Sequence, residues 1–287
     1  MSKPSLALAD IRAAMVDSVI ENDRGVILIL YVHYSVVFAS LLTLSYASEL
    51  TKPMAVYAAS VGLIAGVMTF GRTILLLYFV SAGVTLYIQG LISKRTSFVI
   101  GLLFIVAFFA MAFFMGKGGV DNGVFENIMW NFKVYILAGI AAFNGYILSG
   151  QPDVPGLLLI PNFLKDFLSA FGTIVESTPN VLPFVETPLP TNVYTALFPW
   201  YHDGGILGIV FGFGVIGFAS TYLFDARYNS RTSLFLYSIS LYPLIMMVFE
   251  EQYFRAYTLW VLALLLVVVV KVVEKFDIRK LSRQPSK

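Results

Sequence analysis

The stretch GGILGIVFGFGVIGFASTYLF, residues 204–224, decides the structural class of this chain. It contains no charged residue, and it matches the roughly 20 apolar residues that a helix needs to cross about 30 Å of hydrocarbon. Over the whole chain, 58% of the residues are hydrophobic and 13% are charged, a composition that water-soluble domains do not have. The sequence therefore indicates a membrane protein.

Six other runs share this apolar character. Backbone groups left unpaired in lipid are so costly that we expect each run to be a helix. We therefore predict an all-α fold, a polytopic membrane helical bundle with about seven transmembrane helices, four of them in 25–116 and three in 204–273. The seven predicted spans are 25–47, 53–70, 73–92, 97–116, 204–224, 232–249 and 256–273.

The distribution of Lys and Arg predicts the orientation, because basic residues gather on the cytoplasmic side of a membrane. Seven crossings divide the connecting segments into two alternating sets. One set contains 11 of the 19 basic residues, and we place it, with the basic tail 274–287, in the cytoplasm. The other eight are spread over 1–24, the turn at 71–72, 117–203 and 250–255, and we place these segments outside. The basic residues of the cytoplasmic set are Lys52, Lys94, Arg95, Arg227, Arg231, Lys271, Lys275, Arg279, Lys280, Arg283 and Lys287.

The segment 1–24 is thus expected to lie outside, although no span precedes it. It contains Asp10, Asp17, Glu21 and Asp23 and no continuous apolar core, so it does not have the pattern of a signal peptide. Either these residues are translocated unaided, or spans that would precede them are missing from the chain.

The segment 117–203 is predicted to be one large extracytoplasmic loop region. It is not hydrophilic throughout, because 134–148 is apolar and a second apolar face recurs at helical spacing opposite Lys165, Asp166 and Ser169. We expect helices that lie in the outer membrane interface; alternatively, 134–148 and 157–171 cross as a pair, which leaves the topology elsewhere unchanged. The second face consists of Phe163, Leu164, Phe167, Leu168 and Phe171, and the rings expected at headgroup depth are Trp130, Tyr135, Tyr146 and Trp200.

Several kinds of chemistry are disfavoured by residues that the chain lacks. It has no cysteine, which excludes disulfides, thiolate metal sites and thiol nucleophiles. It has no D-x-D pair, Walker loop, H-E-x-x-H motif or nucleophile elbow, so metal-dependent and nucleotide-driven reactions are disfavoured. We predict no metal site and no nucleic-acid partner, since no basic stretch combines with an exposed face.

Ionisable residues at the mouth of a membrane bundle are the first functional candidates. Arg72 lies in the short turn FGRT (70–73) between the second and third spans, where its guanidinium could bind a phosphate or pair with a lipid headgroup. Asp203 precedes the span at 204–224, where it could cap the helix or accept a proton from an attacking hydroxyl. His202 could serve the same step, whereas His33 is expected to be a hydrogen-bonded interior residue.

A second group of ionisable residues closes the outer end of the last two spans. Glu251 and Arg255 are four residues apart, the spacing of an ordinary helical ion pair. Arg255 would nevertheless lie on the same side of the membrane as Arg72, and two arginines facing outward across a bundle could clamp a diphosphate.

The residues that lead into the span at 204–224 read NVYT (192–195), FPWY (198–201), Asp203 and GILG (205–208). This pattern resembles a segment of the Wzy-type oligosaccharide repeat-unit polymerases, the O-antigen polymerases, with Gly204 in place of the Phe that is usual there. Two shorter similarities occur in the family's order, GRT at 71–73 and AAFN at 141–144. In the second, Asn144 replaces the family's Asp.

The resemblance implies a GT-C-like glycosyltransferase on the outer face of the bacterial inner membrane, multi-pass, with its N-terminus outside and its C-terminus in the cytoplasm. The growing glycan would leave undecaprenyl diphosphate and join the sugar of an incoming lipid-linked repeat unit. No metal, cofactor or nucleotide is implied, because a diphosphate is a competent leaving group. The implied partners are the undecaprenyl-diphosphate-linked oligosaccharide, the lipid bilayer, a Wzz-type chain-length regulator and a flippase.

The resemblance also implies roles for the candidate residues. Arg72, with Arg255, would stabilise the departing diphosphate, and Asp203 or His202 would orient or deprotonate the attacking hydroxyl. An aromatic cluster would stack against sugar rings, or would instead form an interfacial belt. The residues expected to bind sugar are Asn192, Tyr194, Phe198, Trp200 and Tyr201.

Three other functions remain open from the sequence. A transporter would need polar residues within its spans, and the spans contain few beyond His33, Gln89 and scattered Ser, Thr and Tyr. An O-antigen ligase would share the donor chemistry but deliver the glycan to the lipid A core. A non-catalytic scaffold of polysaccharide assembly fits a short chain, and family members usually have several more spans before the first one predicted here.

Overall fold

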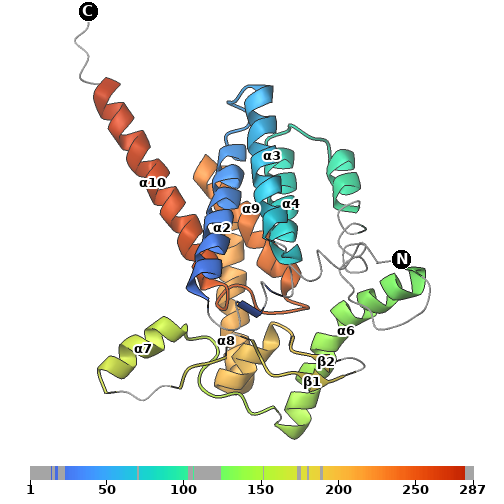
Figure 1. Cartoon of the computed structure of the whole chain (residues 1–287). Coiled ribbons are helices and arrows are strands. Elements are labelled where there is room, and N and C mark those ends of the chain that lie inside the picture. The colour runs from blue at the N-terminus through green and yellow to red at the C-terminus, as the bar shows by residue number, and fades with distance from the viewer. Residues whose placement is uncertain are drawn as a thin grey trace, which may run out of the picture.

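The structure is a computed structural model of the 287-residue chain, and it describes residues 14, 17–18, 23–69, 71–102, 106, 124–150, 152–172, 176–179, 181–187 and 190–281. The described chain is helical apart from one two-stranded hairpin and the connecting loops. The expectation of an all-α membrane protein is therefore confirmed. Figure 1 shows a bundle of roughly aligned helices with a layer of helices and loops across one end. The helices are α2 (Arg24–Leu44), α3 (Lys52–Met68), α4 (Arg72–Ile88), α6 (Val124–Ser149), α7 (Asn162–Ala170), α8 (Leu197–Ala226), α9 (Arg231–Met246) and α10 (Tyr257–Leu281).

Within the described residues, three helices are long and apolar enough to cross a membrane: α2, α8 and α10. Helices α3 and α4 are apolar but have 17 residues each, or about 26 Å at 1.5 Å per residue. These helices make the chain a multi-pass membrane protein. The predicted span 97–116 lies largely outside the described residues, so a total of seven spans stays a prediction.

Local sequence signals explain where several helices start. The Asp23 carboxylate accepts a hydrogen bond of 2.8 Å from the Gly25 N–H at the start of α2, and the Ser230 hydroxyl accepts one of 3.1 Å from Ser233 N–H at the start of α9. Both are N-caps, which satisfy donors that the first helical turn leaves unpaired. In α3, a proline occupies the first turn, where its missing N–H costs nothing.

The core of the bundle lies between α2, α3, α4 and α9, whose buried residues include Phe38, Leu77 and Phe235. Helix α3 approaches its neighbours through a stripe of small residues, Ala58, Gly62, Ala65 and Gly66. A Cβ atom at Gly62 would lie 2.2 Å from the Ser40 hydroxyl oxygen, which itself donates to the Ala58 carbonyl over 2.7 Å. Small residues of this kind let membrane helices pack closely where no hydrophobic effect drives them together.

Helix α8 differs from the prediction at its start. The helix begins at Leu197 rather than at Gly204, and it breaks at Gly205, which has φ 60° and ψ −149°. Only glycine adopts this conformation readily. The part before the break folds back over the part after it, so that a Cβ at Gly212 would lie 2.2 Å from the Trp200 ring. We call residues 197–204, the part before the break, the hooked segment; Asp203 lies inside it and does not cap the first turn of a helix.

The predicted extracytoplasmic region forms a layer across one end of the bundle (Figure 1). It contains α6, α7 and a hairpin in which β1 (Val185–Glu186) pairs antiparallel with β2 (Pro190–Thr191). The apolar stretch 134–148 is part of the longer, continuous helix α6. The five apolar residues predicted for one face of α7 are all exposed, while Lys165 is completely buried. The position of these helices relative to a membrane stays a prediction.

The bundle thus has two ends. We call the end that carries Arg72, Asp203 and Arg255, beside the layer of α6 and α7, the outer end. We call the opposite end, which carries Lys94, Arg227 and Arg231, the inner end. The names follow the predicted orientation, and in Figure 1 the inner end lies at the top, toward the C-terminus of α10.

Candidate functional site

A cavity of about 160 Å³ opens at the outer end, and we call it the outer cavity. Three segments form it: the start of α7 with the loop before it, the short segment around Thr178, and the loop that leads into α10. Polar side chains of Asn162, Thr178, Arg255 and Tyr257 line it together with apolar ones. Its complete lining is Leu158, Ile160, Pro161, Asn162, Thr178, Pro179, Phe254, Arg255 and Tyr257.

Arg255, which the sequence singled out, belongs to this lining, but its ion pair differs from the predicted one. Its Nη1 atom forms an ion pair with Oε1 of Glu250, 2.7 Å away, instead of with Glu251, and the side chains of Arg255 and Glu250 are 17% and 26% exposed. The predicted pairing failed because 250–256 is a loop and not a helix, so a spacing of four residues no longer aligns two side chains. Burial raises the pKa of Glu250 above its usual value, although the positive charge of Arg255 partly opposes this shift.

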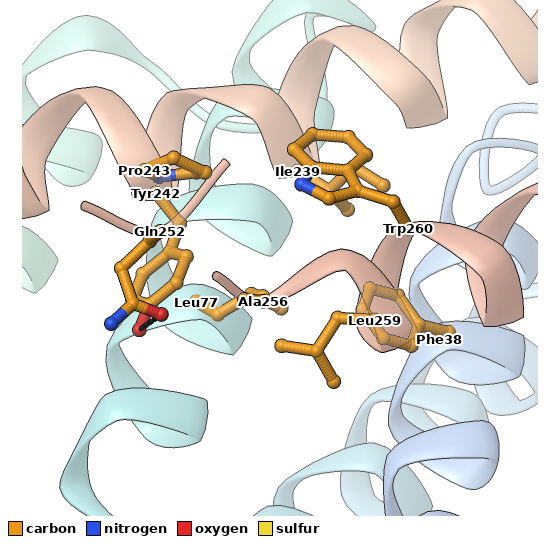
Figure 2. Close-up of a pocket in the computed structure, with 9 residues that line it drawn as sticks. All are labelled: Phe38, Leu77, Ile239, Tyr242, Pro243, Gln252, Ala256, Leu259 and Trp260. Atoms are coloured by element: carbon orange, nitrogen blue, oxygen red, sulfur yellow. Dashed lines mark hydrogen bonds between the residues drawn. The ribbon is translucent and has the colours of Figure 1, made fainter. Parts of the chain in front are cut away.

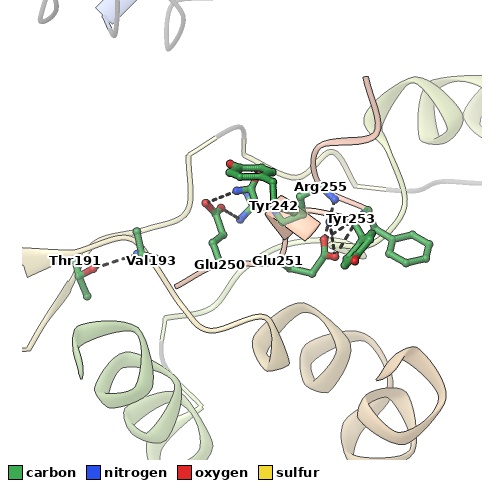
Figure 3. A network of polar contacts seen from close by, with 9 residues as sticks. Thr191, Val193, Tyr242, Glu250, Glu251, Tyr253 and Arg255 are labelled. Carbon is green, nitrogen blue, oxygen red and sulfur yellow. Dashed lines mark hydrogen bonds and ion pairs between the residues drawn. The ribbon is translucent and has the colours of Figure 1, made fainter. Parts of the chain in front are cut away.

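Glu251 instead organises the backbone of this loop. Its carboxylate accepts hydrogen bonds from the backbone N–H groups of Tyr253, Phe254 and Arg255, at 2.8 to 3.1 Å (Figure 3). The residue is 1% exposed, and charge-assisted bonds of this kind are strong when water is excluded. The loop is therefore fixed in a shape that presents Arg255 to the outer cavity.

A second cavity lies beside the first, inside the outer end of the bundle, and we call it the bundle cavity. It has a volume of about 150 Å³ and is lined by Tyr34, Thr73, Ile74, Leu77, Tyr242, Gln252 and Leu259. A narrow apolar recess continues from it between α2, α4, α9 and α10 and shares Leu77, Tyr242, Gln252 and Leu259 (Figure 2). The Gln252 amide donates to Glu250 Oε2 over 3.0 Å, so Gln252 of the bundle cavity and Arg255 of the outer cavity share Glu250 as a partner.

Arg72 lies at the edge of this arrangement. It is the first residue of α4 and only 8% exposed, and its neighbour Thr73 lines the bundle cavity. Arg72 and Arg255 are thus at the same end of the bundle, as the sequence predicted. Arg72 belongs to α4 and Arg255 to the loop before α10, and of the two only Arg255 lines the outer cavity.

His202 and Asp203 form a clamp in front of the outer cavity. The Asp203 carboxylate accepts backbone N–H bonds from Leu158 (2.9 Å) and Leu159 (2.8 Å). His202 Nδ1 lies 2.7 Å from Asp203 Oδ1, and Nε2 lies 3.0 Å from the Val154 carbonyl oxygen. Both of these partners are acceptors, so both ring nitrogens can donate only as an imidazolium. The clamp holds the loop 154–159, which supplies Leu158 to the cavity wall.

The aromatic cluster is more deeply buried than a sugar-stacking surface requires. Tyr194, Phe198 and Trp200 are 1%, 0% and 5% exposed. Tyr194 stacks on Phe198 with ring centroids 4.4 Å apart, and Trp200 meets the edge of Phe254 at 5.0 Å. The faces of these three rings are occupied by protein, which argues against the expected stacking on sugars and against an interfacial position for Trp200. Trp200 packs the hooked segment onto the loop before α10, whereas Tyr194 and Phe198 belong to a cluster with Ala142 and Phe143 of α6.

The two other residues expected to bind sugar remain accessible. Asn192 and Tyr201 are half-buried, and Tyr201 contacts Phe143 of α6 at a centroid distance of 5.6 Å. Neither lines the outer cavity. Asn162, Thr178, Gln252 and Tyr257 were missed by the sequence analysis, because single polar residues on segments far apart in sequence give no pattern before the fold brings them together.

Comparison with known proteins agrees with the resemblance seen in 192–208. Over 198 residues the chain is 27% identical to a protein named O-antigen polymerase from Shigella dysenteriae, a match that covers 65% of this chain and 48% of that protein. The chain thus spans about half the length of this curated relative. No family model matches the chain, and no solved structure matches it. The predicted similarity of this chain to the O-antigen polymerases is therefore confirmed.

Proposed function

We propose that the chain polymerises lipid-linked oligosaccharide repeat units by glycosyl transfer at its outer end. The observation that carries this proposal is the outer cavity, which places the arginine Arg255 beside Asn162, Thr178 and Tyr257. A guanidinium suits a diphosphate. Asn162 and Thr178 hydrogen-bond each other, and their remaining hydrogen-bonding capacity, together with the Tyr257 hydroxyl, suits sugar hydroxyls. The similarity to a protein named O-antigen polymerase supports the same reaction.

The proposed reaction needs little from the protein beyond position and charge. The bond between C1 of the donor sugar and the diphosphate oxygen breaks, and an acceptor hydroxyl forms the new bond to C1. The departing diphosphate, whose charge Arg255 and Arg72 stabilise as it develops, takes up the hydroxyl proton. Holding two membrane-bound reactants in one orientation supplies a large part of the rate enhancement.

Asp203 and His202 act as positioning residues in this proposal. Their hydrogen bonds already engage both carboxylate oxygens and both ring nitrogens, so they support the cavity wall at Leu158. We assign the more distant sugars of a repeat unit to Asn192 and Tyr201, which are half-buried.

The membrane setting completes the proposal. Seven spans in a GT-C-like arrangement place the outer end on the periplasmic face of a bacterial inner membrane, and the exposed apolar face of α7 lies in the outer leaflet. The donor carrier is undecaprenyl diphosphate, which a flippase brings to this face, and a Wzz-type regulator sets chain length. The reaction uses no metal.

The test is the polysaccharide made by a host that synthesises the cognate repeat unit and depends on this protein for its polymer. Arg72→Ala should abolish long-chain polymer while a single repeat unit still reaches the cell surface. Arg72→Lys should not restore it, because an ammonium cannot reproduce a planar fork. Arg95→Ala, at the inner end, is the matched control. Long-chain polymer in a normally expressed Arg72→Ala variant would remove Arg72 from the mechanism.

A further inference from the structure

A third cavity lies at the inner end, far from the proposed reaction, and we call it the inner cavity. With a volume of about 330 Å³, it is the largest of the cavities described here. It lies between the end of α4, the turn from α8 to α9 and the first turn of α9. Its lining is Ile88, Gln89, Arg227, Tyr228, Asn229, Ser230, Arg231 and Leu234.

Two guanidinium groups give the inner cavity its charge. Arg227 is held over the ring of Phe224, with its central carbon 3.5 Å from the centroid, and over Tyr228 at 4.4 Å. Its Nη1 donates to the Phe224 carbonyl. These contacts hold the Arg227 side chain in one orientation without neutralising it, because its partners among the residues that the structure describes are rings and a carbonyl.

Arg231 is held by the turn between α2 and α3. Its Nε donates to Glu49 Oε1 over 2.7 Å, and its Nη2 donates to the Ser48 hydroxyl over 2.9 Å. The ion pair is open to solvent, with side chains 36% and 55% exposed, so the Glu49 carboxylate can be exchanged for another anion at little cost. Arg231 is also the first residue of α9, whose N-terminus adds positive potential.

The rim of the inner cavity is apolar as well as charged. Ile88 and Leu234 line it, and Tyr228, which is 69% exposed, extends from it. The cavity lies where α4 and α8 end and α9 begins, at the end of the bundle that the predicted orientation places at the cytoplasmic headgroups. A bound molecule would therefore meet cations, hydrogen-bonding groups of Asn229 and Ser230, and an apolar surface at once.

We propose that the inner cavity binds the phosphate group of an anionic phospholipid in the cytoplasmic leaflet. Arg227 and Arg231 contact the phosphate oxygens, Asn229 and Ser230 hydrogen-bond the headgroup, and the acyl chains lie against Ile88 and Leu234. Basic cavities between helices at the cytoplasmic side of membrane proteins are suited to such headgroups. The proposal is independent of the proposed glycosyl transfer.

The test is lipid binding by the purified full chain in detergent, titrated with phosphatidylglycerol and followed by native mass spectrometry. Arg227→Gln should weaken binding about tenfold, the effect of losing one charge-assisted contact. Arg95→Gln removes an exposed arginine at the same end, and this matched control should change the affinity less than about twofold. Glu49→Gln should tighten binding, because it releases Arg231 from its competing partner.

Competition by other phosphate compounds tests whether the cavity selects a lipid, and a folding check shows whether weaker binding of a variant reflects a loss of structure. Phosphatidylcholine should not compete, and inorganic phosphate should compete only weakly, because neither offers an anionic headgroup with acyl chains. Equal affinity of Arg227→Gln and Arg95→Gln, or full competition by inorganic phosphate, would overturn the proposal. If circular dichroism shows that Arg227→Gln is poorly folded, the phosphatidylglycerol affinity of Glu49→Gln becomes the deciding measurement. Unchanged or weaker lipid binding by Glu49→Gln would then contradict the assignment.

Discussion

The two ends of the bundle have the same pair of residues in different surroundings. Each has an arginine within 2.7 Å of a glutamate beside a cavity, Arg255 with Glu250 at the outer end and Arg231 with Glu49 at the inner end. At the outer end the side chains are 17% and 26% exposed, and a glutamine and a buried second glutamate surround them. At the inner end they are 36% and 55% exposed.

This difference shows what burial does to an ion pair. An exposed pair contributes little to stability and exchanges readily, which suits an end that meets lipid headgroups. A partly buried pair is costly to break, because one charge is then left without its partner in a low-dielectric surrounding. The outer pair therefore holds Arg255 in a fixed orientation, as a preorganised site requires.

The largest expected effect concerns the placement of the two ends on opposite sides of the membrane. The chain has no cysteine, so a cysteine introduced at Glu186 or at Lys94 is the only thiol. In intact cells a membrane-impermeant maleimide should label Glu186→Cys and leave Lys94→Cys unlabelled until the membrane is permeabilised. Labelling of both, or of Lys94→Cys alone, would remove the distinction between an outer and an inner end.

A smaller effect is expected when the clamp of the outer cavity is removed. Asp203→Ala deletes the acceptor of three hydrogen bonds, two from backbone N–H groups and one from His202, which should cost about 3 kcal/mol. The apparent thermal midpoint in detergent should fall, and the loop 154–159 should become sensitive to limited proteolysis. Asp166→Ala, an exposed aspartate on α7, is the control. Equal behaviour of the two variants would argue that the clamp does not hold the cavity wall.

The smallest effects distinguish the two ion pairs directly. Glu250→Gln should destabilise the protein by about 2 kcal/mol, because the guanidinium of Arg255 loses its charged partner where water is scarce. Glu49→Gln should change stability by about 0.5 kcal/mol or less. Apparent unfolding midpoints of both variants in the same detergent test this ranking, and a larger loss for Glu49→Gln would reverse the comparison.

Much of the bundle could be predicted from the sequence, because hydrophobic length alone locates a membrane helix. Four of the predicted spans match α2, α3, α4 and α9 to within a few residues at each end. The start of α8 was placed wrongly because Leu197 to Trp200 reads as an aromatic loop segment, whereas tertiary contacts with Phe254 and Gly212 make it helical. The predicted start at Gly204 falls next to the break at Gly205, which lies inside α8.

The site was less predictable than the fold. The sequence correctly placed Arg72 and Arg255 at one end, since both follow from counting crossings. It could not identify the partner of Arg255, because that depends on the loop conformation set by the buried Glu251. It also could not show that Tyr194 and Phe198 are buried, because aromatic residues have the same pattern in a packed cluster and in a carbohydrate-binding surface.

The most direct test of the central claim, that the outer end carries the chemistry, compares two neutral double variants. Glu250→Gln with Arg255→Gln removes both charges of the outer pair and leaves neither one buried alone. Glu274→Gln with Arg95→Gln makes the same change in exposed residues of the inner end. In a host that depends on this protein for its surface polysaccharide, the first variant should be expressed normally but make no long-chain polymer, and the second should make polymer of ordinary length. Ordinary polymer from the outer variant would contradict the account.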